Sequence, residues 1–343
     1  YTHQAVVVPP NDQPVWWGRN MDTFGALRTV YLDESNIVGY HDDFVQSTER
    51  HPHQHLAELL NELGHTRARI GVEMDNYYYS AAAHHHLTAG LPEADFIDAT
   101  GLVNWQRAVK SPRELEYMRA AGAIVTKAHE RILDLVEPGI RKNDLVAEIY
   151  HTVIHGVDGY GGDYPAIVPL LPTGADASAP HLTWDDRPFE KGFATFFELA
   201  GCVRRYHTPL SRTVFLGHPP QDILDAEKAV LEGLEAGLEA GRPGNRAGDI
   251  AAALYASLER AGIEREGRCG YPIGLSYPPD WGERTISIRV SDDTDLKPGM
   301  TFHFMPGLWS SDWGLEITES ILIKESGPAE TLANVPRQLF VKP

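Results

Sequence analysis

An internal duplication constrains the fold of this 343-residue chain more than any other feature. The segment 138–150, PGIRKNDLVAEIY, returns at 243–255 as PGNRAGDIAAALY, with Pro, Gly, Arg, Asp, Ala and Tyr in register. A second match follows at a similar offset, where GFATFFE at 192–198 corresponds to GMTFHFM at 299–305. Each copy therefore reads as helix, helix and then strands. A single pair of repeats this long predicts two pseudo-symmetric αβ halves that share one sheet, not a solenoid.

The duplication also predicts where a functional site lies. We expect the site where the two halves meet, and Glu198 and Met305 hold equivalent positions in the two copies. Each is expected to end a strand, at a change from apolar residues to glycine. Apolar surroundings would raise the pKa of Glu198 by desolvation, whereas a nearby arginine would lower it. The sequence leaves both outcomes open, since Arg204, Arg205 and Arg212 follow.

Length and composition indicate an ordinary soluble globular protein of about two domains. Hydrophobic residues make up 42% and charged residues 23% of the chain, as in globular proteins generally. No apolar run approaches the roughly 18 residues of a membrane span. The net charge of −18 argues against nucleic acid and anionic membranes as partners, because both attract basic surfaces. Proteins of salt-adapted hosts carry a similar acidic surplus.

Cysteine usage and the first residues bear on the compartment. Only Cys202 and Cys269 occur, which does not indicate a disulfide framework and favours a reducing cytoplasm. The chain opens at Tyr1 and runs directly into strand-like residues without a signal-peptide pattern. We therefore expect that residues are missing at this end.

Two domains are expected. Residues 1–109 alternate short apolar runs with polar, helix-like stretches and predict a small N-terminal α/β domain. Ser111 and Glu114 then form a capping box with Pro112 at the first helical position, so a long helix begins there. Residues 110–343 contain the duplication and are predicted to be the catalytic domain.

Two segments of the second copy resemble a metallopeptidase active site with replaced ligands. GYPIGL at 270–275 stands where the relatives read Gly-His-x-Ile-Gly-Leu, and KPGMTFHFMPG at 297–307 stands where they read Lys-Pro-Gly-Met-x-x-x-x-Glu-Pro-Gly. Tyr271 thus replaces a ligand His and Met305 a ligand Glu. On these frames the chain resembles the creatinase, prolidase and methionine aminopeptidase family. The resemblance implies an α+β protein, with a pita-bread C-terminal domain of two pseudo-symmetric αβ halves on a curved antiparallel sheet, and a smaller creatinase-like N-terminal domain.

The family's other ligand positions are altered as well. FELA at 197–200 replaces Val-Asp-Leu-Gly, Pro209 stands at the second Asp, and Thr318 replaces the Glu of Ile-Glu-Asp-Thr. Only Glu198 keeps a coordinating side chain, unless a small shift of the alignment brings Glu319 into place. Several carboxylates and an imidazole are needed to hold such metals. We therefore predict no metal and no cofactor.

The resemblance also implies which residues act in place of a metal. Creatinase, a metal-free member, uses a His on the loop between the halves, and His181 in Ala-Pro-His-Leu matches that position. The predicted catalytic residues are Glu198, as nucleophile or general base, and His181 and His207. The predicted substrate-binding residues are Tyr206, Tyr271, Asp280, Trp281 and Glu283, with Tyr1 and His3 where creatinase has carboxylate contacts from the neighbouring subunit.

Four segments together are most similar to the metal-independent branch of the family that opens the cyclic amidine ectoine: 17–22, 197–201, 204–207 and 277–283. This implies hydrolysis of ectoine or a related cyclic amidine to N-acetyl-2,4-diaminobutyrate in a cytoplasmic homodimer, with a deacetylase acting downstream and no nucleic acid or membrane partner. Two alternatives stay open. One is another C–N hydrolase of this fold, such as a creatinase-like amidinohydrolase or an Xaa-Pro peptidase relative; the other is a non-catalytic binding module.

Two histidine clusters are not expected to hold metal. Three consecutive histidines at 84–86 cannot point to one centre. The alternating His51, His53 and His55 are expected to lie on a loop in solvent.

Overall fold

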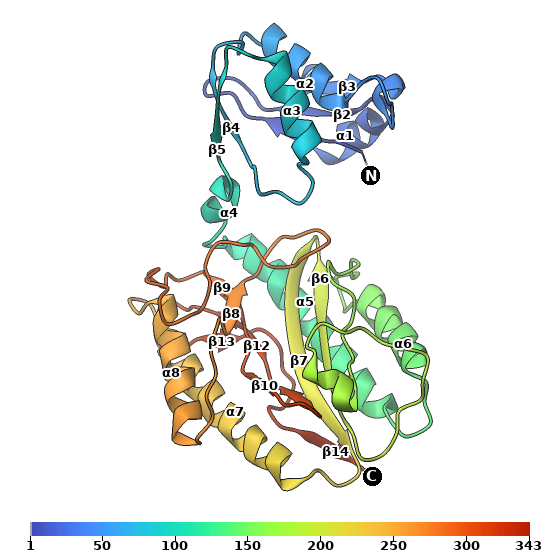
Figure 1. Cartoon of the computed structure of the whole chain (residues 1–343), viewed down its shortest axis with the longest axis vertical. Helices are drawn as coiled ribbons and strands as arrows, with labels where there is room; N and C mark the ends of the chain where they lie inside the picture. Colours follow the sequence, from blue (N-terminus) through green and yellow to red (C-terminus); the bar gives the residue numbers. More distant parts are fainter. Residues whose placement is uncertain (1) are drawn as a thin grey trace. The chain divides into compact units, whose positions relative to one another are not determined.

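The computed structural model describes residues 2–343 and divides into two compact units, the first ending at Leu102 and the second comprising Val103–Pro343. Along the chain, the boundary between the two units falls at the start of helix α4 (Leu102–Gln106; Figure 1). Among the described residues, no helix combines the length and the apolar character needed to cross a membrane. Each unit has a hydrophobic core of its own.

The first unit is a small α/β arrangement around a core that includes Trp17, Tyr40 and Leu60. Strand β2 pairs antiparallel with β1 and parallel with β3, and β4 pairs parallel with β5. Helices α2 and α3 pack against each other. The elements are β1 (Ala5–Val7), β2 (Val15–Arg19), α1 (Thr23–Thr29), β3 (Ile37–Tyr40), α2 (Pro52–Glu62), β4 (Arg69–Val72), α3 (Ala81–Gly90) and β5 (Asp95–Asp98), with short 3-10 helices at Asn20–Asp22, Glu34–Asn36 and Asp42–Phe44.

His51, His53 and His55 do not lie on a solvent-exposed loop, as the sequence suggested. His51 caps α2 by accepting a hydrogen bond from the backbone N–H of His53, and His53 is buried in the first turn. The rings of His51 and His86 stack at 4.7 Å. Burial, with neighbouring imidazoles, lowers the pKa of His51 to about 4 and that of His53 to about 3. The expectation was wrong because a helix begins at Pro52 and turns alternate histidines inward.

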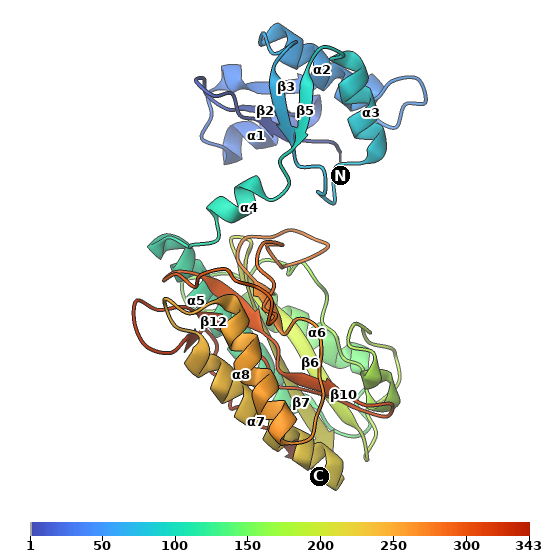
Figure 2. The ribbon, with the colours of Figure 1, turned by 60° about the vertical axis from the view of Figure 1, so that its left-hand side comes forward.

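The second unit repeats one succession of elements (Figures 1 and 2), as the duplication predicted. Its helices segregate from its mostly antiparallel strands, so the α+β class is confirmed. The first half contains α5 (Pro112–Leu135), α6 (Lys142–His155), the 3-10 helix η4 (Gly174–Ser178), β6 (Ala194–Val203) and β7 (Tyr206–Leu216). The second half contains α7 (Gln221–Ala240), α8 (Ala247–Arg260), β8 (Gly270–Pro272), β9 (Thr301–Phe304), β10 (Gly307–Trp309), β11 (Gly314–Glu316), β12 (Glu319–Leu322), β13 (Glu330–Thr331) and β14 (Phe340–Lys342).

Equivalent residues start the second helix of each half. Arg141 precedes α6 and its guanidinium binds Asp144 in the first turn at 2.7 Å. Arg246 precedes α8, and its backbone N–H donates to Asp249 at 2.7 Å. An acidic side chain in the first turn stabilises a helix because it satisfies free N–H groups and opposes the helix dipole. The predicted capping box of α5, from Ser111, is also formed.

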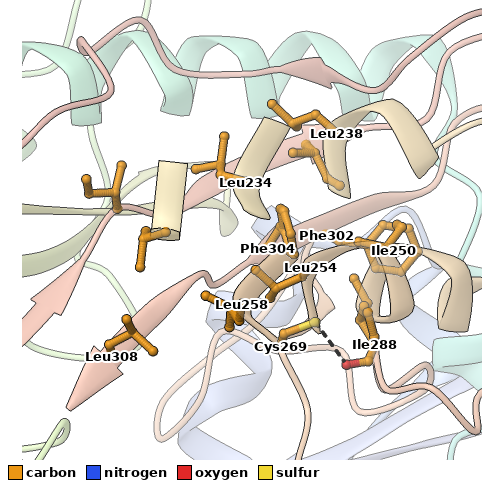
Figure 3. Packing of buried hydrophobic residues seen from close by; sticks show 14 of the residues in the cluster. Leu234, Leu238, Ile250, Leu254, Leu258, Cys269, Ile288, Phe302, Phe304 and Leu308 are labelled. Atoms are coloured by element: carbon orange, nitrogen blue, oxygen red, sulfur yellow. Dashed lines mark hydrogen bonds between the residues drawn. The ribbon is translucent and has the colours of Figure 1, made fainter. Parts of the chain in front are cut away.

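Each half buries one face of its strands under its own pair of helices. In the first half, Phe197 and Leu199 of β6 pack with α5 and α6. In the second half, α7 and α8 run side by side (Figure 2), and Figure 3 shows their leucines packed around Phe302 and Phe304 of β9. Every residue of β6 is nevertheless buried. Its other face is therefore covered too, by the second half.

Helix α5 approaches β6 so closely that one contact admits only glycine. A Cβ atom added to Gly201 would lie 2.0 Å from the carbonyl oxygen of Ala121 on α5. Atoms at that distance overlap heavily, so the helix and the strand would have to separate.

Replacing Gly201 by Ala is expected to lower the free energy of unfolding by about 2–3 kcal/mol, the upper part of the usual cost of overpacking. Gly161→Ala is the matched control, because a Cβ there meets no atom within 4 Å; it should change stability by less than about 0.5 kcal/mol. Urea denaturation of both variants measures the difference. Equal midpoints would contradict the close contact.

Candidate active site

Glu198 lies inside the second unit, on the face of β6 that points away from α5 and α6. Its neighbours Phe197 and Leu199 pack with those helices, and successive strand residues point to opposite faces. Glu198 therefore faces the second half, where its Oε1 lies 3.8 Å from Nδ1 of His303. The expectation that Glu198 ends its strand is wrong, because β6 continues to Val203 in register with β7.

The surroundings of Glu198 favour its neutral form. Burial raises the pKa of Glu198 well above its ordinary value, and the carboxyl group of Glu316 raises it further. The arginines that the sequence offered as partners do not pair with Glu198. Arg212 pairs with Glu319 at 2.6 Å, Arg205 donates to the backbone carbonyls of Ser276 and Tyr164, and Arg204 is exposed. Desolvation therefore decides between the two outcomes that the sequence left open.

Glu316 is a second buried carboxylate of the site, and the sequence analysis missed it. Its backbone N–H donates to Oγ1 of Thr213 at 2.8 Å, two residues along β7 from Ser211, which lies opposite Glu198. Burial raises the pKa of Glu316 to about 7, although polar neighbours and an arginine oppose the shift. A single acidic residue within the apolar run 314–317 was the available signal.

A chain of hydrogen bonds crosses the site beside Glu198. Trp281 Nε1 donates to the hydroxyl of Tyr271 at 2.7 Å, and that hydroxyl lies 2.9 Å from Nδ1 of His303. On the far side of the ring, Nε2 lies 2.8 Å from Oγ1 of Thr318. All four side chains are buried. The sequence analysis missed His303, which stands at an unspecified position of the family frame 297–307.

The residues at the family's ligand positions do not fit a divalent metal ion. Tyr271 and Thr318 both hydrogen-bond to His303, and neither is a usual ligand of such ions. Glu319, the alternative that a shifted alignment offered, pairs with two arginines. Within residues 2–343, no group of three or more His, Cys, Asp or Glu side chains is arranged to hold a metal. No catalytic step is therefore assigned to a metal.

Two of the predicted substrate-binding residues are engaged with cations of the protein itself. The hydroxyl of Tyr206 donates to Glu114 at 2.8 Å and accepts from Arg107 at 2.9 Å. Glu283 forms a buried ion pair with Lys110 at 2.5 Å. Burial raises the pKa of Glu283, although Lys110 opposes the shift. These contacts fix Tyr206 and Glu283 near Trp281. They also use hydrogen-bonding groups of both side chains that a ligand would otherwise contact.

Three further predicted residues occupy different surroundings. His207 is buried, and its Nε2 accepts from the backbone N–H of Ala166 at 2.9 Å; burial lowers its pKa to about 3. His181 is exposed in the loop after η4. Asp280 accepts from the backbone N–H of Gly282 at 2.9 Å. Over residues 2–343, no hydrogen bond or ion pair joins any of the three to Glu198.

The two predicted residues at the start of the chain belong to the first unit. Tyr1 lies outside the described residues. The ring of His3 lies 4.9 Å from that of His51 and 5.0 Å from that of His53, and burial lowers its pKa. A cavity of about 460 Å³ opens beside His3, lined mostly by β1, β4 and apolar side chains. Its lining contains one acidic side chain, Glu73, so the paired carboxylates of the second unit remain the stronger candidate for chemistry.

Comparison with known proteins accounts for both units. The model of the creatinase/prolidase N-terminal domain matches residues 1–109, and that of metallopeptidase family M24 matches residues 116–325. The chain is 59% identical to ectoine hydrolase of Halomonas elongata, over all of this chain and 87% of that protein. It is 30% identical to the probable dipeptidase PepE of Mycobacterium tuberculosis, over 74% of this chain and 67% of that protein.

Solved structures agree with this assignment at the level of the fold. The prolidase of Thermococcus sibiricus superposes with a TM-score of 0.84 and 17% identity, over 99% of this chain and 88% of that one. A dipeptidase of Pyrococcus horikoshii gives 0.82 and 22%, over 99% and 89%. With the family model over residues 116–325 and 59% identity to ectoine hydrolase over its whole length, the chain belongs to metallopeptidase family M24 and is a hydrolase with the pita-bread fold.

Proposed function

We propose that this chain hydrolyses the ring of ectoine, or of a closely related cyclic amidine, to N-acetyl-2,4-diaminobutyrate without a metal ion. The observation that carries the proposal is the 59% identity to ectoine hydrolase over the entire chain. The chemistry of the site supports it. The residues at the ligand positions favour hydrogen bonding over metal binding, and two buried carboxylates, Glu198 and Glu316, lie close together.

The charge of the substrate suits this pair of carboxylates. A protonated cyclic amidine carries one positive charge, which is delocalised over its two nitrogens and the carbon between them. Opposite charges in a buried site attract strongly because little water screens them. A bound amidinium would therefore lower the raised pKa of Glu198 and restore its ionised form. Two metal ions in the same place would repel this substrate.

In the proposed reaction, Glu198 either activates a water molecule or attacks the ring carbon itself. With water, a C–O bond forms at the carbon between the nitrogens while Glu198 takes the proton. The bond from that carbon to one nitrogen then breaks, and the departing nitrogen receives a proton that we assign to His181. The new hydroxyl group gives its remaining proton to the released amine, so the carbon becomes the amide carbonyl of the acetyl group. The proton held by Glu198 then replaces the one that His181 gave. His207, Tyr206, Tyr271, Asp280, Trp281 and Glu283 are proposed to shape the site and orient the ring.

The remaining proposals concern assembly and cellular context. The family resemblance suggests a homodimer in which Tyr1 and His3 of one subunit reach the carboxylate of a substrate held by the other. It also suggests a cytoplasmic enzyme. Because the proposed product is an N-acetylated diamine, the enzyme class that consumes it is a deacetylase.

Two other functions are separated by one experiment. Another C–N hydrolase of this fold would leave ectoine intact and cleave a creatinase-type amidine or an Xaa-Pro dipeptide. A non-catalytic module would bind a ligand and return it unchanged. Isothermal titration of the protein with ectoine, followed by product analysis, distinguishes these outcomes from the proposed hydrolysis.

Glu198→Gln is expected to lower kcat for ectoine by at least about 10²-fold, because the amide cannot act as base or nucleophile. The fold should persist, since a neutral amide of the same shape replaces a carboxyl group whose neutral form burial favours. Product formation and the circular dichroism spectrum measure the two effects. Glu325→Gln, at an exposed carboxylate of the same unit, is the control. Wild-type rates in the Glu198 variant would refute its role.

The pH profile tests the coupling between the two carboxylates. A base must be ionised, so kcat/KM should fall as the pH drops through the raised pKa of free Glu198, above the usual range of a glutamate. Glu316→Gln removes the neighbouring negative charge, and the acid limb should move to lower pH by about one unit or more. An acid limb that stays in place would show that Glu316 does not influence Glu198.

Removal of metals should leave turnover unchanged. After exhaustive dialysis against a chelator, the rate with ectoine and the metal content of the protein are measured together. A metal-dependent prolidase treated in parallel is the positive control and should lose activity. A rate that disappears and returns with a divalent ion would contradict the metal-free proposal.

A further inference from the structure

His303 is the central residue of the hydrogen-bond chain in the site and links Tyr271 to Thr318. Its two ring nitrogens bind one hydroxyl each, Tyr271 at 2.9 Å and Thr318 at 2.8 Å. The ring is fully buried, on the face of β9 opposite Phe302 and Phe304. It therefore points away from α7 and α8, toward Glu198 of the first half.

The outer partners of the chain fix the direction of its hydrogen bonds. The indole N–H of Trp281 can only donate, so the oxygen of Tyr271 accepts from it at 2.7 Å. The backbone N–H of Ser211 likewise donates to Oγ1 of Thr318 at 2.7 Å. Each hydroxyl oxygen thus accepts one hydrogen bond from outside, and each still carries a proton of its own.

The neutral imidazole can accept a hydrogen bond from only one of the two hydroxyl groups. Burial lowers the pKa of His303 to about 3, helped by the charges of Arg212 and Arg268, so near neutral pH the ring has one N–H and one acceptor nitrogen. If Nδ1 carries the proton, it donates to Tyr271, and Thr318 donates to Nε2. If Nε2 carries it, it donates to Thr318, and Tyr271 donates to Nδ1.

We infer that His303 is a positioning residue for the hydrolytic reaction, because it leaves the hydroxyl proton of either Tyr271 or Thr318, but never both, free to bind the substrate. This inference rests on the proposed function. The two hydroxyls stand at positions where the family places metal ligands. The hydroxyl whose proton is free therefore takes the place of a metal as the group that polarises the substrate.

Glu198 selects between the two arrangements. Its Oε1 lies 3.8 Å from Nδ1. Once a bound amidinium has restored the ionised form of Glu198, the carboxylate favours a proton on this nearer nitrogen. His303 then donates to Tyr271, and the hydroxyl proton of Tyr271 is the free one. A donor there is suited to the oxygen that becomes the amide carbonyl, since fixed donors stabilise developing negative charge.

Nitrogen NMR of histidine-labelled protein tests the inference without substrate. The His303 signals are assigned by their loss in His303→Gln. Near neutral pH one nitrogen should be protonated and the other not. Tyr271→Phe should shift the Nδ1 signal, and Thr318→Val the Nε2 signal. A doubly protonated ring would overturn the inference, and so would nitrogen chemical shifts that neither substitution changes.

Kinetics with ectoine give the second readout. His303→Gln keeps one acceptor and one donor, whereas His303→Leu keeps neither. The Leu variant should lose about 10²-fold in kcat with KM changed less than about threefold, and the Gln variant clearly less.

Adding Tyr271→Phe to His303→Leu should cause no further loss, because both act through one chain. If the losses in kcat are additive and follow the losses in thermal midpoint, His303 has only a structural role and the inference is overturned. If the wild type leaves ectoine intact while the NMR result holds, the proposed function fails and the positioning of the two hydroxyls by His303 stands.

Discussion

The site depends on the two-residue period of β6 and β9. In each strand, one set of alternate residues packs under the helices of its own half, Phe197 and Leu199 in the first and Phe302 and Phe304 in the second. The other set must then face the opposite half. Glu198 and His303 meet for this reason, although more than one hundred residues separate them in the chain. A shift of either strand by one residue would turn its polar side chain into an apolar core.

Buried charge is distributed unevenly around this meeting point. Glu319 is neutralised by Arg212, and Glu283 by Lys110, in ion pairs that are almost completely buried. Glu198 has instead a neutral imidazole and a second carboxyl group beside it. A buried carboxylate is costly unless it is paired or protonated. Glu198 therefore lacks a cationic partner that a bound cation would supply, which is the physical argument for the cyclic amidinium proposed as substrate.

Several features followed from local sequence signals alone. The start of α5 was predictable because a capping box and a proline act within one helical turn. The repeated order of elements was predictable because the two copies share residues at helix starts, Arg141 with Asp144 and Arg246 with Asp249. Tyr271 was predicted as a site residue because its segment matches a family frame, and in the structure its hydroxyl lies 2.9 Å from Nδ1 of His303. His303 was missed because nothing in its immediate sequence separates it from an ordinary strand residue. Glu316 was missed although it is the single acidic residue of an apolar run, because that signal does not show what the side chain faces.

The sequence by itself determined the fold class, the duplication and the family, since these depend on residue types and their spacing. Only the tertiary structure decided how the remaining polar groups pair. Arg212 binds Glu319 and not Glu198, Tyr206 binds Arg107 and Glu114, and the surroundings of Glu198 raise its pKa. Desolvation and hydrogen bonding depend on atoms from distant parts of the chain, and their positions are fixed only when the two halves pack together.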